Sequence, residues 1–290
     1  MSKKVQLILS SGGARGLAQI GVIQALEDSG YQIEKVAGSS AGALIGGFYA
    51  AGKLDVFTEW VKDLNRMDVM RYFDVHLNSR GFIKGKKIMK ELEKMLGNPK
   101  IEDLDIEYKA VSSNIISHEP VWFEKGSLLE AIRASISIPG VFTPVKHGEG
   151  MLVDGAISTP LPMNAFERKK DEKMVAVNLN AMTEYKAPQD LPDEKHREGL
   201  VENFYQWREK ARKLFNVNKE KSDKKPGMYG VLFRSFEMMQ ESYTLELIKT
   251  YKPDILVELS RESADTFEFN KAEELIAYGK EQTEKVLKNA

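Results

Sequence analysis

The sequence predicts a three-layer α/β/α fold with a mainly parallel central sheet. Short apolar runs alternate with helical patterns along the chain, as expected where crossover helices join parallel strands. Two of these runs end in glycine-containing turns that lead directly into a helical pattern. With 290 residues, 42% of them hydrophobic, the chain can bury one large core. We therefore expect a single domain over 1–290, with a motif-bearing core over about 5–180 and a less distinctive helical part over about 197–290.

The alternation assigns the elements in order. Five apolar runs are predicted as strands, at 5–9, 33–37, 108–112, 174–179 and 255–259. Helical patterns lie between and after them, at 17–28, 41–51, 55–65, 85–96, 127–134, 197–215, 231–250 and 271–287. Most of these helices should cover the sheet on both faces. The polar stretches 181–196 and 216–227 are expected as surface loops.

The first predicted strand leads into a glycine loop at 11–16, with the sequence SGGARG. The backbone amides of Gly12, Gly13 and Ala14 could converge on a negatively charged oxygen. Arg15 would add a charge or anchor the loop. Nucleotide binding is the alternative, but the loop lacks both the Gly-x-Gly-x-x-Gly spacing and the Gly-Lys-Ser/Thr ending of such sites. An oxyanion hole is the better interpretation.

The second predicted strand ends in the spacing Gly38-x-Ser40-x-Gly42, which is typical of a nucleophile elbow. Glycines two residues either side of a serine leave room for a sharp strand-to-helix turn with the hydroxyl at its apex. The uncharged run 41–51 is expected as a buried helix whose first amides, beginning with Ala41, point at Ser40. The partial positive charge of that helix end favours an oxyanion. Ser40 is therefore the predicted nucleophile.

A nucleophilic serine needs a group that accepts its proton. The chain has four histidines: His76, His118, His147 and His196. None lies in a segment that would place an imidazole beside Ser40. Asp154 lies at the end of a short apolar strand expected at 151–153 and precedes Gly155 in the chain's only Asp-Gly dipeptide. Two interpretations stay open at this point, a hairpin turn, which Asp-Gly strongly favours, and the catalytic base.

Four sequence blocks together resemble the patatin-like phospholipases, a family of serine acyl hydrolases. The blocks are 12–16 (GGARG), 38–42 (GSSAG), 134–144 (ASISIPGVFTP) and 154–155 (DG), in the family's order. The stretch 80–85 (RGFIKG) also looks like a segment common in bacterial members. The resemblance implies a patatin or acyltransferase-lysophospholipase-like fold, a dyad of Ser40 and Asp154 in place of a triad, and the glycine loop as oxyanion hole.

The implied reaction is hydrolysis of carboxylic esters of lipids through an acyl-enzyme on Ser40. A solvated aspartate, with a pKa near ~3.9, is a poor base, so the site would have to desolvate Asp154. The apolar-rich segments 67–73 and 231–239 would line or cap an acyl pocket, or else pack in the core. Two other functions remain open: acyl transfer to an acceptor other than water, and lipid binding without catalysis.

Composition argues against several other classes of protein. The 42 basic and 43 acidic residues give no overall basic footprint for nucleic acid. The chain has no cysteine and no His-Glu-x-x-His pattern, so neither a metal nor another cofactor is expected. No apolar window approaches the ~20 residues of a membrane span, and the first apolar run is too short for a signal peptide. Residence in the cytoplasm is expected. Transient contact with a lipid surface is a hypothesis, and the oligomeric state is left open.

Overall fold

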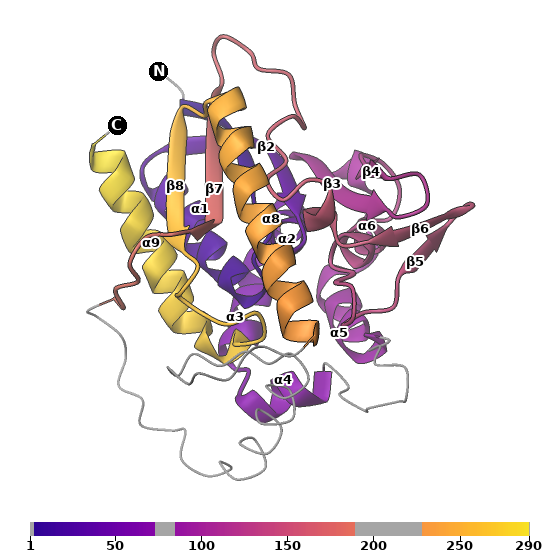
Figure 1. Ribbon diagram of the computed structural model, residues 1–290. Coiled ribbons are helices and arrows are strands. Elements are labelled where there is room, and N and C mark those ends of the chain that lie inside the picture. The colour runs from indigo at the N-terminus through magenta and orange to yellow at the C-terminus, as the bar shows by residue number, and fades with distance from the viewer. Residues whose placement is uncertain (1–2, 73–84, 189–227, 290) are drawn as a thin grey trace.

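A mixed sheet organises the protein, as a computed structural model shows for residues 3–72, 85–188 and 228–289 (Figure 1). Five of its strands run parallel in the order β3-β2-β1-β7-β8. Their bounds are β1 Lys3–Leu9, β2 Tyr31–Ser39, β3 Glu107–Asn114, β7 Lys173–Ala181 and β8 Ile255–Ser260. These are the five runs predicted as strands, so the expected α/β class and mainly parallel sheet are confirmed.

Beyond β3 the sheet continues in short antiparallel strands, of which only the apolar strand before Asp154 was expected from the sequence. β6 (Gly150–Val153) pairs with β3 and with β5 (Val145–His147), while β4 (Glu119–Phe123) also pairs with β3. Each is three to five residues long, which is too short for an alternation of apolar and polar residues to stand out. β6 matters for the site, because its end brings Asp154 to the carboxyl-terminal end of β3.

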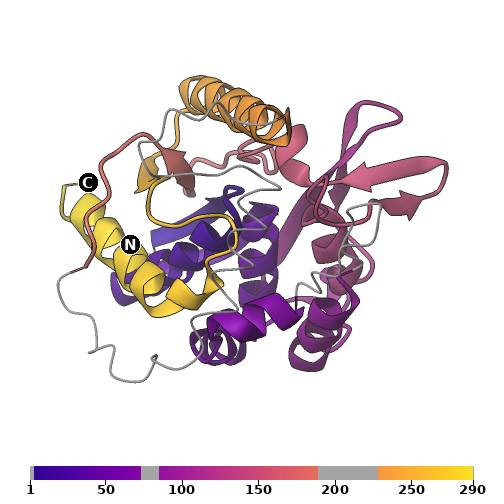
Figure 2. The same cartoon turned by 60° about the horizontal axis from the view of Figure 1, so that its bottom comes forward.

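Helices cover the two faces of the sheet unequally (Figure 2). One face carries a single large apolar cluster to which seven α-helices contribute: α1 Ala18–Asp28, α2 Ala41–Ala50, α3 Leu54–Lys62, α4 Arg66–Tyr72, α5 Lys86–Leu96, α6 Leu128–Ser135 and α9 Ala272–Lys288. On the other face α8 (Met228–Tyr251) and the segment 161–166 cover a smaller cluster around Ile8 and Met174. Within the described ranges, α8 is the only helix on that face.

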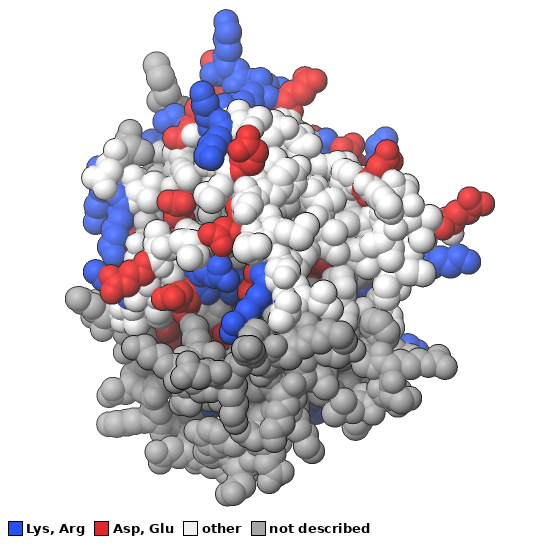
Figure 3. Space-filling model, in the orientation of Figure 1, with Lys and Arg blue, Asp and Glu red and all other residues white. Residues whose placement is uncertain are grey.

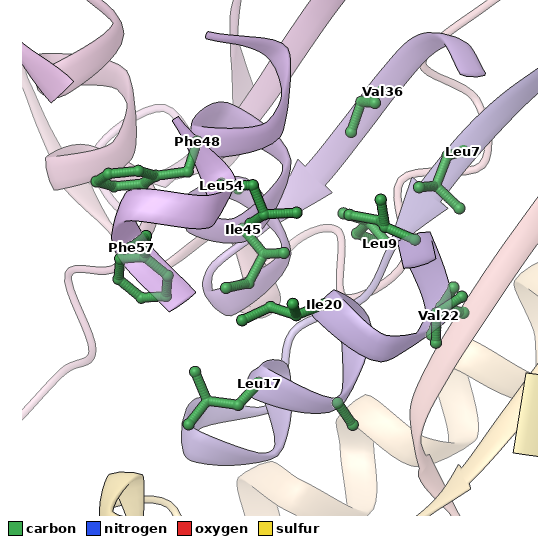
Figure 4. Close-up of a cluster of buried hydrophobic side chains, with 14 of the residues drawn as sticks. Leu7, Leu9, Leu17, Ile20, Val22, Val36, Ile45, Phe48, Leu54 and Phe57 are labelled. Atoms are coloured by element: carbon green, nitrogen blue, oxygen red, sulfur yellow. The ribbon is translucent and has the colours of Figure 1, made fainter. Parts of the chain in front are cut away.

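The large core fixes the first two strands and the helices that follow them (Figure 4). Leu9 of β1, Val36 of β2, Ile20 of α1 and Ile45 of α2 belong to this cluster and are almost completely shielded from solvent. Burial of each such side chain contributes about 1.5–3 kcal/mol. The two turns that end β1 and β2 therefore project from a rigid base.

Some predicted segments differ from the structure or lie outside its described part. The predicted helices within the described ranges are found to within three residues at each end. The segment 67–72 forms α4 (Arg66–Tyr72), which was not predicted as a helix. Residues 73 and 80–84, the predicted helix 197–215, the loop 216–227 and the part of the loop 181–196 from 189 onward lie outside the described residues.

Charged side chains of both signs are interspersed on the described part of the face that carries α8 (Figure 3). This distribution agrees with the balanced composition of 42 basic and 43 acidic residues. On that part of the face no large patch of one sign is present.

Candidate active site

The nucleophile elbow has the strand–turn–helix geometry that the glycine spacing predicts. Ser40 lies between β2 and α2 with φ 53° and ψ −117°, a strained conformation for a residue other than glycine. A Cβ on Gly38 would lie 2.2 Å from the carbonyl oxygen of Gly42, and one on Gly42 would lie 2.3 Å from that of Leu9. Only glycine fits at these positions, because backbone atoms cannot move aside as a flexible side chain can.

The fold brings Ser40 and Asp154 together across 114 residues of sequence. The Ser40 hydroxyl donates to Oδ2 of Asp154 over 2.6 Å, and both residues are almost fully buried. Asp154 does not form the hairpin turn that Asp-Gly favours. It follows β6 and caps the short helix η3 (Gly155–Ile157), where its Oδ1 accepts from the amide of Ala156 over 2.9 Å.

The environment of Asp154 raises its basicity. Burial raises the pKa of this carboxyl to about 7, and the hydrogen bonds from Ser40 and from the Ala156 amide oppose that rise only in part. An aspartate with a pKa near neutrality accepts a proton far more readily than a solvated one. The desolvation that a Ser-Asp pair needs is therefore present at this position.

An apolar pocket opens beside the pair and encloses about 810 Å³ of empty space when its mouth is counted. Ser40, Gly13 and Ala41 line it at one end. Most of the remaining wall is apolar, with large side chains from several helices and from the segment after α6, including Leu17, Phe57, Trp60, Val69, Tyr72 and Phe142. Among the described residues no charged side chain lines the pocket, which suits a hydrocarbon chain.

Comparisons with known proteins match this chain to one family. The family model of the patatin-like phospholipases matches residues 7–166. The chain belongs to this family. An uncharacterized NTE family protein of Mycobacterium tuberculosis is 32% identical over 323 residues, covering 96% of this chain and 90% of that protein. The chain is thus a member of a family of lipid hydrolases.

Two further matches are weaker, one because it covers a small part of the other protein and one because its similarity is low. A lysophospholipase nte1 of Neurospora crassa is 33% identical over 195 residues, which cover 66% of this chain but 13% of that protein. The crystal structure of VipD from Legionella pneumophila covers 99% of this chain and 67% of VipD, at 16% identity and a TM-score of 0.48.

The glycine loop of this patatin-like chain supplies fewer free donors than expected. Ala14 was expected among the oxyanion donors, but its amide donates to the carbonyl of Thr266 over 2.9 Å and is therefore engaged. Gly13 and Ala41 begin the helices η1 (Gly13–Leu17) and α2, where the first amides have no intrahelical partner. Both line the pocket with Ser40, whereas Gly12 does not.

Arg15 points away from the pocket and ties the glycine loop to distant segments. Its guanidinium donates to the carbonyls of Arg261 and Ala264 and to the side-chain oxygen of Asn180. Burial lowers the pKa of this guanidinium. Of the two roles weighed for Arg15, a charge at the site or a loop anchor, these contacts fit the anchor.

The two apolar-rich segments have different positions. From α4, Val69 and Tyr72 line the pocket. The segment 231–239 belongs to α8, which lies over the opposite face of the sheet, so it does not line the pocket. Its apolar side chains are not among the buried core residues either. There Leu232, Met238 and Met239 are 60%, 64% and 67% exposed.

The segment between β8 and α9 contributes to the pocket wall, which was not expected from the sequence. Thr266, Phe267 and Phe269 line the pocket, and the carbonyl of Thr266 holds the glycine loop through Ala14. The segment carries no motif. The general rule that ligands bind at the carboxyl ends of parallel strands would have pointed to it, because it follows the end of β8.

The remaining polar residues show no second site of the kinds considered, as far as the described ranges extend. His118 lies in a turn and His147 on β5, both exposed, while His76 and His196 lie outside the described residues. Across residues 3–72, 85–188 and 228–289 no group of three potential metal ligands occurs. No helix in these same ranges combines the length and the hydropathy needed to cross a bilayer.

Proposed function

We propose that this protein is a serine hydrolase that cleaves carboxylic esters of lipids, with Ser40 as nucleophile and Asp154 as base. The observation that carries the proposal is the 2.6 Å hydrogen bond from the Ser40 hydroxyl to a buried carboxylate at the end of an apolar pocket. The lysophospholipase among the relatives supports a lipid substrate. A long acyl chain would occupy the pocket, while the ester carbonyl would lie over Ser40.

The proposed reaction has two halves. In the first, Ser40 Oγ forms a bond to the ester carbonyl carbon while its proton passes to Asp154 Oδ2. The amides of Gly13 and Ala41 stabilise the resulting oxyanion. Collapse breaks the bond to the alcohol, which leaves with the proton from Asp154.

The second half releases the acid. Asp154 takes a proton from water as the water oxygen attacks the acyl carbon. Collapse breaks the bond to Ser40 and returns the proton to its Oγ. The net result is one ester and one water converted to a carboxylic acid and an alcohol.

The test uses Ser40→Ala and Asp154→Asn, with release of fatty acid from lysophosphatidylcholine and from p-nitrophenyl esters of graded chain length as readouts. Each variant should lose at least about 10³-fold in kcat while keeping its thermal unfolding transition. Ser39→Ala is the matched control, because the neighbouring hydroxyl is buried and makes no hydrogen bond within the described part of the chain. Turnover by Ser40→Ala at the wild-type rate would refute the proposal. Acyl transfer to an added alcohol in place of water would assign the same dyad to a transferase.

A further inference from the structure

The amide of Ser40 is held by a second serine. It donates to Oγ of Ser135, at the end of α6, over 2.8 Å. The Ser135 hydroxyl in turn donates to the carbonyl of Val111 on β3 over 2.6 Å. A hydroxyl has one proton, and here the Val111 carbonyl receives it, so the oxygen can only accept from Ser40. The direction of both hydrogen bonds is therefore fixed.

This contact lies where the backbone most needs support. Ser40 has a positive φ of 53°, which a non-glycine residue keeps only when its surroundings hold it. Its amide is buried together with its side chain, and Ser135 is fully buried. Without the Ser135 oxygen, both the Ser40 amide and the Val111 carbonyl would lose a buried partner. The elbow would then have reason to relax toward another conformation.

The segment after Ser135 holds the other member of the pair. The amide of Asp154 donates to the carbonyl of Ser137 over 2.9 Å. Two groups that are two residues apart in sequence thus bind the backbone amides of Ser40 and Asp154. The separation of Ser40 Oγ from Asp154 Oδ2 depends on this short stretch of chain.

Alternate residues of the stretch 135–138 make different kinds of contact. Ser135 and Ser137 bind the two backbones, whereas Ile136 and Ile138 line the apolar pocket. One short segment therefore forms both a wall of the pocket and the support of the dyad.

We infer that Ser135 is a positioning residue for Ser40: its hydroxyl holds the nucleophile's amide, and so aims Oγ at Asp154 and keeps that amide out of the oxyanion hole. The inference rests on the proposed hydrolase function. It predicts a defect in the chemical step, because a misplacement of about 1 Å in a reacting group costs up to ~10²-fold in rate. The pocket that binds the acyl chain would be left in place.

The experiment compares Ser135→Ala and Ser135→Cys with the wild type. The sulfur of cysteine is a weak acceptor of similar size, so this variant keeps the packing and weakens the hydrogen bond. For both we expect kcat on a p-nitrophenyl ester to fall about 10- to 100-fold with KM changed less than about twofold. The rate of labelling of Ser40 by a fluorophosphonate should fall by the same factor as kcat/KM. Ser135→Thr, which restores a hydroxyl, should recover most of the labelling rate.

Thr283→Ala is the matched control for the loss of one buried hydroxyl. Thr283 is fully buried in α9, and its hydroxyl donates to the carbonyl of Gly279 over 2.7 Å. It should change the unfolding temperature without changing kcat. If Ser135→Ala does not fold, the cysteine variant alone decides the outcome.

Three outcomes are distinguishable. Wild-type protein that neither hydrolyses esters nor reacts with fluorophosphonate would refute the proposed function itself. An active wild type with an unchanged kcat in folded Ser135→Ala or Ser135→Cys would overturn the positioning role alone. A fall in stability with kcat unaffected would also overturn it, since that is the result for a hydroxyl with only a structural role.

Discussion

The proposed dyad of Ser40 and Asp154 and the apolar pocket adjoin each other but are stabilised by different interactions. Directional hydrogen bonds between single atoms hold Ser40 and Asp154, and backbone carbonyls pack against Gly38 and Gly42. The pocket is walled by apolar side chains from many elements, which make contacts without a preferred direction. Substitutions at Ser40 or Asp154 should therefore abolish activity, whereas substitutions in the pocket should change activity only in part.

Gly38→Ala should give the largest effect. A new Cβ would lie 2.2 Å from the carbonyl oxygen of Gly42, and the atoms that it meets belong to the backbone, which cannot move aside. We expect a loss of at least about 3 kcal/mol in unfolding free energy, measured by chemical denaturation, together with loss of activity. Gly30→Ala is the control. Gly30 has a positive φ, unlike Gly38, but a Cβ added there would meet no described atom within 4 Å, so only about 1 kcal/mol should be lost.

The pH dependence of catalysis should be set by the protonation of Asp154 and should be the same when pocket residues are replaced. Asp154 must be unprotonated to accept a proton, and burial raises its pKa to about 7. We expect kcat/KM to rise with pH with its midpoint near 7, to level off above about pH 8, and to be about 100-fold lower at pH 5 than at pH 8. A Trp60→Ala variant should show the same midpoint. A midpoint near pH 4 would contradict desolvation of Asp154.

The same pKa shift should make Asp154 a cost to stability. The folded protein retains this proton between pH values of about 4 and 7, where the unfolded chain has lost it. Stability from this group is thus fully present below the unfolded pKa and is lost as the pH rises through 7. Asp154→Asn should gain about 1–3 kcal/mol over wild type on going from pH 5 to pH 8, measured by denaturation at both values. Ser39→Ala, at a buried neighbouring position without a titratable side chain, should show no such gain.

Trp60→Ala should give the smallest change, in chain-length preference alone. Trp60 lines the pocket, with its ring 5.8 Å from that of Phe57 and 5.5 Å from that of Tyr72. Removing it should lower kcat/KM for short acyl esters and favour longer ones, each by about 3- to 10-fold. Val56→Ala, at an exposed position on the same helix, should leave the preference unchanged. An unaltered preference in Trp60→Ala would place the acyl chain elsewhere.

The sequence predicted the turn at Ser40 better than it predicted the residues of the pocket wall. The elbow, the glycine loop and the five parallel strands follow from glycine spacing and short apolar runs, which are local signals. The pocket wall follows only in part: the segment 67–73, which includes Val69, was expected to line or cap it, whereas Phe267 reaches it from a segment without a motif. The short strands β4 and β5 were missed because segments of five and three residues are too short to show a period.

One prediction and one of the interpretations left open were wrong because of partners far away in the chain. Ala14 looked like a free donor, but the carbonyl that engages it is that of Thr266, from the segment between β8 and α9. Asp154-Gly155 looked like a hairpin turn, but the pairing of β6 with β3 takes the chain into η3 instead. Neither contact leaves a mark on the neighbouring sequence.

By itself the sequence determined the backbone at Ser40, because only glycines at 38 and 42 tolerate the close approach of neighbouring carbonyl groups. It also determined the strands, since apolar runs must be buried wherever the sheet forms. Tertiary structure alone decided that Asp154 meets Ser40, that Ala14 is engaged, and that α8 turns its apolar side chains away from the pocket. The physical reason is that local conformation depends on a few adjacent residues. The contact between distant groups depends on which strands pair with each other in the sheet.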